Sequence, residues 1–157
     1  MINKKLQQDL ILMSKKDQRM IKSKKWSRAI IKHNTARLKD IIKKYGRWPS
    51  SKFVGLAGES AAWLIAQHSD YDVKFQECCL KLLKKLPPTK QRKIFIAYLI
   101  DRILVNRNAK QIYGTQFFKG KPRPIKNIAH LDLRRKKMNL EPFAVYQKHM
   151  KKVSKFF

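Results

Sequence analysis

The chain has 157 residues, of which 43% are hydrophobic, 38 are lysine or arginine and only 10 are acidic, so its formal net charge is +28. This length suits one domain with a hydrophobic core, and the apolar content excludes a compositionally disordered chain. No apolar run approaches the roughly 18 residues of a membrane span, and the first residues lack a signal-peptide pattern. We therefore expect a cytoplasmic protein without a transmembrane segment, with a single domain over residues 1–157 that ends in a basic tail over residues 151–157.

The periodicity of apolar residues predicts a mainly α-helical fold. Gly46 is expected to stop the second helix, and Asn139 is expected to take the left-handed cap position. Thr89 is expected to cap the start of the fifth helix. The segments "QIYGTQFF" and "RPIKNI" are predicted as two short strands joined through "KGKP". The expected fold is a single-domain bundle of about six to seven helices with a small β-hairpin near residues 111–128. The predicted helices cover residues 4–22, 27–44, 54–68, 73–86, 90–105, 130–138 and 142–152.

The positive charge predicts a class of partner. Lysine pairs recur along the whole chain instead of forming one block. A field of this sign attracts nucleic acid and other polyanions, although an AT-rich genome also enriches lysine. Contact with nucleic acid or another polyanion is therefore an expectation with an open alternative, and the oligomeric state is not predicted.

Three charged or titratable residues fall on helix faces that are otherwise apolar. Asp17 lies on the apolar stripe of the first predicted helix, His68 on that of the third and Asp101 on that of the fifth. A charge that is buried without a partner costs several kcal/mol, so each group must contact another group, a ligand or solvent in a cleft. For any one of them alone, a structural network is the commoner explanation, such as a bridge between Asp101 and Arg102.

Metal ligation is weakly indicated. "QHSDYD" contains His68, Asp70 and Asp72 at spacings of two, which do not share a helix face, although a loop after His68 would bring them together. The only cysteines, Cys78 and Cys79, are adjacent and match neither a disulfide framework nor a zinc site. The sequence therefore predicts no metal and no cofactor.

An ordered series of short motifs resembles a bacterial domain family of unknown function. Its marks are "DQ" near the N-terminus, a "GxP[ST]" turn, "QHxDxD", "AYLxDR", "QxYGTQ" and "DxRR…GL". Here they read Asp17-Gln18, "GRWPS", "QHSDYD", "AYLIDR", "QIYGTQ" and "DLRRKKMNL", within about residues 8–150. Arg47 is an extra residue in the turn, and Asn139 stands where the family has glycine. The resemblance implies no established reaction, substrate or cofactor.

The polar positions of this resemblance match those that the buried-charge pattern selects, and we expect them to line one polar pocket. His68 is the expected general acid or base, because histidine exchanges protons near neutral pH, and Asp101 or Asp70 would orient it. The other positions are expected to bind the substrate: Asp17, Gln18, Gln67, Arg102, Gln111, Tyr113, Thr115, Gln116 and Arg134.

These residues predict a histidine-dependent hydrolase or transferase that acts on a phosphate-bearing substrate, with a nucleotide or nucleic acid as the expected one. No nucleophile elbow, P-loop or zinc-protease motif is present. The alternative is a non-catalytic, strongly basic RNA- or DNA-binding protein whose polar cluster is structural. In that case Trp26, Trp48, Phe117 and Phe118 stack on bases, unless they belong to the core.

Two further readings concern where the protein acts. An effector or toxin that acts on another cell fits a small basic protein, and the sequence does not separate it from the hydrolase. The first predicted helix is amphipathic, but Asp17 on its apolar face argues against deep insertion into a membrane surface.

Overall fold

The computed structural model describes residues 1–23, 25 and 27–154, so Trp26 and the end of the predicted basic tail lie outside the described residues. The described part is mainly α-helical, with seven α-helices and one two-stranded hairpin. By its internal contacts the chain divides into two compact units, residues 1–82 and 83–157, and each unit is described by itself.

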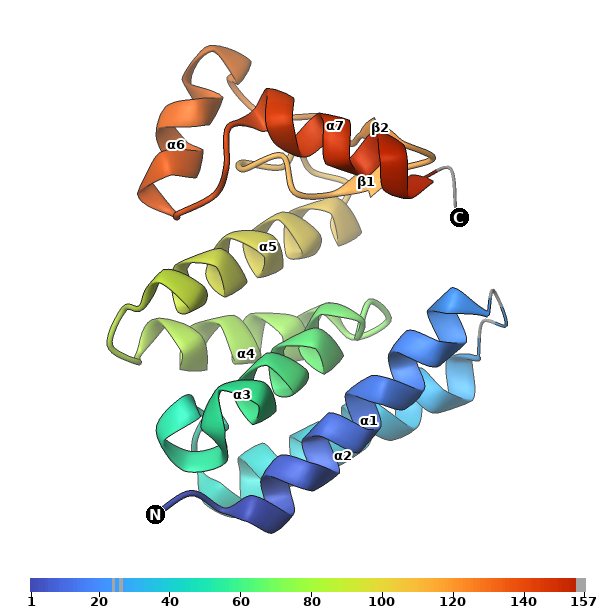
Figure 1. Cartoon of the computed structure of the whole chain (residues 1–157), viewed down its shortest axis with the longest axis vertical. Helices are drawn as coiled ribbons and strands as arrows, with labels where there is room; N and C mark the ends of the chain where they lie inside the picture. The colour runs from blue at the N-terminus through green and yellow to red at the C-terminus, as the bar shows by residue number, and fades with distance from the viewer. Residues whose placement is uncertain (24, 26, 155–157) are drawn as a thin grey trace. The chain divides into compact units, whose positions relative to one another are not determined.

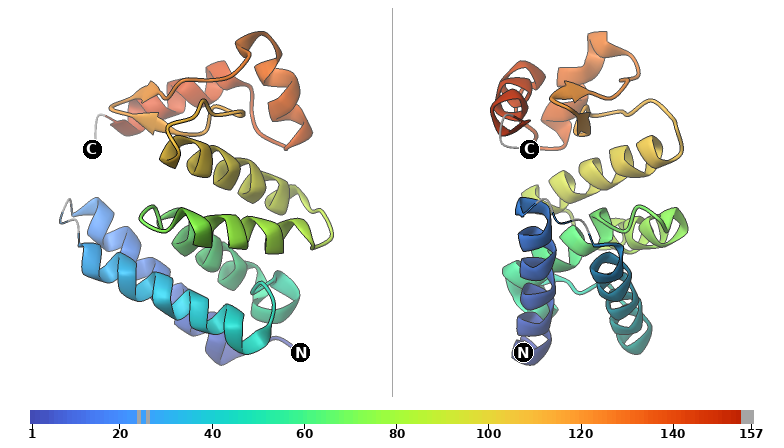
Figure 2. Two further views of the ribbon diagram at one scale, coloured as in Figure 1. Left: turned by 180° about the vertical axis from the view of Figure 1, so that it is seen from behind. Right: turned by 90° about the vertical axis from the view of Figure 1, so that its right-hand side faces the viewer.

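The first unit is built on three helices, α1 (Lys4–Lys22), α2 (Arg28–Tyr45) and α3 (Ser51–Gln67). α1 and α2 run in opposite directions, and α3 packs against both, most extensively against α1 (Figure 1). Figure 2 shows the same arrangement of these three helices from two other sides. Their buried faces carry the apolar residues that the periodicity selected, including Leu10, Leu38 and Ile65.

Local capping sets the ends of these helices. The Asn3 side chain accepts a hydrogen bond from the Leu6 N–H group at 3.0 Å, and Ser27 caps α2 in the same way. Gly46 ends α2, as predicted; it takes the left-handed conformation with φ +63°, and its N–H group donates to the Ile42 carbonyl.

The start of α3 is earlier than the predicted residue 54. A first turn begins at Ser51, and the chain then kinks at Gly55, where φ is +72° and ψ is +166°. Glycine is needed there, because a Cβ atom would lie only 2.4 Å from the Gln7 side-chain nitrogen of α1. The Trp48 side chain of the preceding turn is buried in the core, so it offers no surface for stacking on a base.

α4 (Val73–Lys84) follows α3 and ends two residues before the predicted residue 86, with a turn closed by the Leu86 N–H group and the Leu83 carbonyl. The second unit then contains α5 (Lys90–Asn106), a 3-10 turn η1 (Ile128–His130), α6 (Leu131–Lys137) and α7 (Phe143–Ser154). Two predicted caps are confirmed. Thr89 accepts a hydrogen bond from the Arg92 N–H group, and Asn139 is left-handed with φ +55°.

A hairpin is present near residues 111–128, as predicted, but its strands are shorter and the second one is placed differently. The predicted strand "RPIKNI" is not a strand, although Gln111 and Ile125 form an isolated parallel bridge, and the second strand lies in the "KGKP" stretch that was expected to join the two. β1 (Phe117–Phe118) pairs antiparallel with β2 (Lys121–Pro122), and the two-residue turn between them has positive φ at Lys119 and Gly120, as a type I′ turn requires. Residues 111–116 are not a strand. The backbone N–H groups of four of them donate to side chains of the same unit, so they are not available to a β-ladder; these are Ile112, Tyr113, Thr115 and Gln116. The Gln111 N–H group donates to the Pro124 carbonyl.

Within the described ranges, none of the helices combines the length and the hydropathy that crossing a membrane requires.

Candidate active site

A buried carboxylate holds the predicted catalytic histidine in the first unit. Asp17, in the fourth turn of α1, is buried, and His68 is the C-cap residue of α3. The Nδ1 atom of His68 forms a hydrogen bond with the Oδ2 atom of Asp17. Because α1 and α3 pack closely along their length, the polar position on the apolar stripe of α1 meets the polar end of α3. The carboxylate on His68 is therefore Asp17, a residue that the sequence analysis assigned to substrate binding.

This contact determines what the imidazole can do. A carboxylate only accepts hydrogen bonds, so Nδ1 carries the proton and Nε2 of the neutral ring keeps its lone pair. No residue in the described part of the chain forms a hydrogen bond with Nε2, and 18% of the His68 side chain is exposed. An imidazole that is anchored at one nitrogen and open at the other is suited to accept a proton from a bound molecule.

The other residues of "QHSDYD" have separate partners. The Gln76 side-chain nitrogen donates to the Asp70 carboxylate at 3.4 Å and to the Gln67 carbonyl at 3.1 Å. Asp72 accepts a hydrogen bond from the Phe75 N–H group at the start of α4 and another from Lys39. Across residues 1–23, 25 and 27–154, no three histidine, cysteine or acidic side chains are grouped as metal ligands would be.

Gln67 lies beside His68 and is almost fully buried. Its side-chain oxygen Oε1 accepts no hydrogen bond from the described residues. A buried acceptor without a donor costs about 1–3 kcal/mol, which makes this position favourable for a ligand or water that donates a hydrogen bond.

A basic hollow of about 240 Å³ follows α1 around Gln18, next to Asp17 in the sequence. Its cations suit an anionic group, and it places Gln18 on the same surface as three basic residues. The hollow is lined by Ser14, Lys15, Gln18, Arg19 and Lys22.

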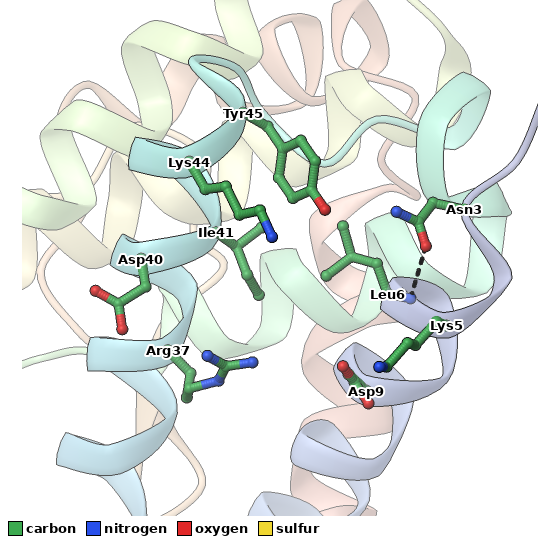
Figure 3. Close-up of a pocket in the computed structure, with 9 residues that line it drawn as sticks. All are labelled: Asn3, Lys5, Leu6, Asp9, Arg37, Asp40, Ile41, Lys44 and Tyr45. Carbon is green, nitrogen blue, oxygen red and sulfur yellow. Dashed lines mark hydrogen bonds between the residues drawn. The ribbon is translucent and has the colours of Figure 1, made fainter.

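A second pocket of the first unit, of about 270 Å³, lies between the start of α1 and the end of α2. In Figure 3, Lys44 and Tyr45 of α2 reach toward α1, whereas Asp40 points away from the gap. The pocket lies on the first turns of α1, and even Asp9, its lining residue nearest to Asp17 in the sequence, is about 12 Å from Asp17 along the helix at 1.5 Å per residue. It is therefore separate from the Asp17–His68 pair. Its lining comprises Asn3, Lys5, Leu6, Asp9, Arg37, Asp40, Ile41, Lys44 and Tyr45.

In the second unit, Asp101 organises the segment that follows α5. Its carboxylate is 0% exposed and accepts hydrogen bonds from the N–H groups of Ile112 (2.7 Å), Tyr113 (3.0 Å) and Thr115 (2.9 Å). The Thr115 hydroxyl donates a further hydrogen bond at 3.0 Å. Burial raises the pKa of the Asp101 carboxyl and outweighs these hydrogen bonds, which lower the pKa.

The two glutamines of "QIYGTQ" bind the same segment to the hairpin. The Gln111 side chain donates to the carbonyls of Gln116 and Arg123, and it accepts from the Gln116 N–H group at 2.8 Å. The Gln116 side chain donates to the Thr115 hydroxyl and accepts from Arg102 at 3.0 Å. The donors and acceptors of these two side chains are thus paired with other side chains and with the backbone, as in a structural hydrogen-bond network.

Two neighbouring arginines of α6 donate hydrogen bonds to the backbone of the same segment. Arg134 donates to the carbonyls of Ile112, Asn127 and Lys126. Arg135, which the sequence analysis did not select, is almost fully buried, donates to the carbonyls of Tyr113 and Glu141, and lies over the Tyr146 ring at 4.9 Å. The available signal was the spacing of four between Leu131 and Arg135, which puts both on the buried face of α6.

The predicted site residues thus form two groups. In the first unit, Asp17 and His68 are joined directly, with Gln67, Asp70 and Gln18 near them in the sequence. In the second unit, Asp101, Arg102, Gln111, Thr115 and Gln116 form one hydrogen-bond network, which Arg134 joins through the Ile112 backbone. Tyr113 contributes its backbone to the network, and burial raises the pKa of its hydroxyl.

The comparison with protein families decides the relationship of the chain. The model of DUF6624, a family of unknown function, matches residues 4–155. The chain belongs to the DUF6624 family. The match covers the whole motif series from Asp17-Gln18 to "DLRRKKMNL", so the resemblance seen in the sequence is confirmed. No curated protein matches this DUF6624 chain, and no solved structure matches it.

Gly114, inside the "QIYGTQ" motif of this DUF6624 protein, provides a test of the network. It has φ +67°, and a Cβ atom there would lie 2.8 Å from the Phe143 ring and 3.1 Å from Ile125. Gly46 is the matched control, because it has φ +63° but nothing within 4 Å of a Cβ atom. Gly46→Ala is expected to cost about 1–2 kcal/mol for the left-handed backbone alone, and Gly114→Ala about 1–3 kcal/mol more because the alanine overpacks the Phe143 contact. Urea denaturation measures both, and equal costs would contradict the close contact.

The ion pair of Lys39 and Asp72 predicts a pH dependence. Lys39 and the Phe75 N–H group hold the pKa of the Asp72 carboxyl below its ordinary value of 3.8, and the same pair raises the pKa of Lys39. A lowered acid pKa adds stability above its unfolded value and loses it as pH falls through the folded value. Asp72→Asn keeps the helix cap and removes the charge, so it is expected to cost only about 0.2–1 kcal/mol at neutral pH, since water screens this partly exposed pair.

This cost is expected to vanish below the folded pKa of Asp72, where the wild-type carboxyl is also uncharged. Chemical denaturation of both proteins at neutral and strongly acidic pH measures it. Asp40→Asn is the control, because Asp40 is an exposed acid next to Lys39 on α2, and it is expected to show no such pH-dependent difference. A difference for Asp72→Asn that is constant with pH would exclude an electrostatic origin.

Proposed function

We propose that the Asp17–His68 pair is the acid–base centre of a hydrolase or transferase that acts on a phosphate-bearing substrate, with a nucleotide or nucleic acid as that substrate. The observation that carries the proposal is the hydrogen bond between Nδ1 of His68 and the buried Asp17 carboxylate, which leaves Nε2 open. A histidine held in this way is the common arrangement of a general base.

The pair supplies a specific step. Nε2 of His68 accepts the proton of a water molecule or a substrate hydroxyl as that oxygen attacks the electrophilic centre. The resulting imidazolium is stabilised by the Asp17 carboxylate and then returns the proton to the leaving group. Water as the attacking group gives hydrolysis, and a second substrate hydroxyl gives group transfer.

Charge supports the phosphate-bearing class of substrate. The net charge is +28, and the hollow next to Asp17 in the sequence contributes Lys15, Arg19 and Lys22. Cationic side chains bind phosphate oxygens through charge-assisted hydrogen bonds and stabilise the charge that develops during phosphoryl transfer or phosphodiester cleavage.

One observation favours the second candidate function, a non-catalytic RNA- or DNA-binding protein. The side chains of Gln111, Thr115 and Gln116 are engaged within their own unit, as a structural cluster would be. In that case basic side chains contact phosphates, affinity falls steeply with salt, and His68 has no role.

A substrate screen distinguishes the two functions. Purified wild-type protein and His68→Ala are incubated with nucleoside mono-, di- and triphosphates, single-stranded RNA and single-stranded DNA, with and without divalent cations, and the products are separated by chromatography. Turnover by the wild type that His68→Ala lacks supports the acid–base centre. Binding of nucleic acid without turnover of any member of the panel supports the binding protein and contradicts the enzyme.

A further inference from the structure

The stretch of sequence that forms the hairpin, residues 102–131, contains no acidic residue. Between Asp101 and Asp132 the sequence contains seven lysines and arginines and no aspartate or glutamate. This one-sided charge covers the end of α5, the "QIYGTQ" segment and both strands. It gives the hairpin an electrostatic attraction for a polyanion that no acid within this stretch offsets.

An exposed aromatic ring lies within this basic stretch. Phe118 of β1 is 55% exposed, whereas the adjacent Phe117 packs at 5.5 Å against the Tyr146 ring of α7. Successive strand residues point to opposite faces, so Phe117 anchors the hairpin and Phe118 faces solvent. The Arg123 guanidinium lies 4.7 Å and the Lys119 ammonium 5.5 Å from the Phe118 ring centroid. An exposed ring flanked by cations is the arrangement on which unpaired bases stack.

A hollow of about 320 Å³ adjoins this ring through Arg123, which contributes to both. Val105, Ala109 and Pro124 give the hollow apolar walls, while Lys110 and Arg123 supply positive charge. Asn108 adds an amide that can both donate and accept hydrogen bonds. The hollow therefore suits one nucleotide, because its apolar walls can contact the base, its amide can bind the edge of the base and its cations can bind the phosphate.

The hairpin that presents these groups is held in place internally. The Arg123 N–H group donates to the Gln116 carbonyl at 3.0 Å, and the Gln111 side chain donates to the Arg123 carbonyl at 2.8 Å. The Tyr146 hydroxyl of α7 donates to the Thr115 carbonyl, next to β1, and α7 lies beside the hairpin (Figure 1). A surface that is already ordered loses little entropy when it binds.

We propose that the β1–β2 hairpin and the adjacent hollow bind a single-stranded nucleic acid. One base stacks on the Phe118–Arg123 surface, the next nucleotide enters the hollow, and Lys110, Lys119 and Arg123 contact phosphates. A single strand is required because a base within a duplex is stacked on both faces and does not expose one to Phe118. This binding surface does not depend on whether the Asp17–His68 pair is catalytic. It specifies that the nucleic-acid ligand is single-stranded.

The test is fluorescence anisotropy with a labelled single-stranded oligonucleotide and its duplex, as RNA and as DNA. It measures binding without turnover, so its result is independent of any reaction. Phe118→Ala is expected to weaken single-strand binding at least about fivefold, the effect of losing one stacked base, and to leave duplex binding unchanged. Arg123→Ala is expected to weaken binding and also to reduce its salt dependence. If Phe118→Ala does not fold, Phe118→Leu takes its place. It keeps an apolar side chain without the ring and is expected to show the same loss of single-strand binding.

Leu133→Ala is the matched control, because Leu133 is a large exposed apolar residue of α6 in the same unit, and its binding is expected to equal that of the wild type. The proposal is overturned if the Phe118 variants bind the single strand as the wild type does. It is equally overturned if the wild type binds duplex as tightly as single strand, or binds neither at moderate salt.

Discussion

Replacing Asp101 with alanine is expected to lower the free energy of unfolding by about 3–5 kcal/mol, the largest effect on stability that we predict for a single residue. The carboxylate is fully buried and accepts from three backbone N–H groups and the Thr115 hydroxyl. Removing it leaves these donors buried without an acceptor, at about 1–3 kcal/mol for each unsatisfied group before relaxation. Urea denaturation followed by circular dichroism at neutral pH measures the loss.

Two further variants show whether hydrogen bonding is the cause. Asp101→Asn has nearly the same volume, but its NH₂ group faces N–H donors, so most of the destabilisation is expected to remain. Asp132→Ala is the control, since this exposed carboxylate accepts one N–H group, that of Phe143 at 2.8 Å, and its loss is expected to cost about 0.5–2 kcal/mol. If Asp101→Ala were no less stable than Asp132→Ala, Asp101 would not organise the segment.

The second large effect concerns activity. His68→Ala is expected to reduce turnover of the phosphate-bearing substrate by about 10²- to 10⁴-fold, the range for a positioned acid–base group. Asp17→Asn is expected to produce much of the same loss, because an amide can present its NH₂ group to Nδ1 and favour the tautomer with the proton on Nε2. Initial rates at saturating and subsaturating substrate separate the chemical step from binding.

His33→Ala is the matched control for these variants, because His33 is an exposed histidine of α2 in the same unit. It is expected to keep wild-type activity. A thermal melt of each variant distinguishes loss of catalysis from loss of folding. Full activity in a folded His68→Ala protein would refute the acid–base role, and a lowered melting temperature without any kinetic effect in Asp17→Asn would make the pair structural.

Most of the helical fold was predictable from local sequence. The bounds of α1 match the prediction at both ends, and the predicted caps at Thr89, Gly46 and Asn139 are confirmed. The predicted bounds were wrong where residues distant in the sequence contact the segment. α3 begins earlier because Gly55 lets the chain kink against Gln7, and the predicted strand over residues 111–118 is reduced to Phe117–Phe118 because Asp101 binds its backbone N–H groups.

The polar residues that interact could be selected from the sequence, but their contacts could not. Asp17, His68 and Asp101 stood out because each interrupts an apolar face. Their partners were assigned incompletely, since Asp17 was expected to bind substrate, and it contacts His68. Arg134 was selected and Arg135 was not, although Arg135 lies four residues after Leu131 and therefore shares its buried helix face.

By itself, the sequence determined the helical class, most helix ends and the identity of the polar residues that must find partners. These properties depend on side chains within one or two helical turns, because capping, left-handed turns and amphipathic periodicity act at that range. Only the tertiary structure decided that Asp17 holds His68 and that Asp101 holds residues 112–115. A buried carboxylate needs donors, and which donors it meets depends on which helices and segments pack against it.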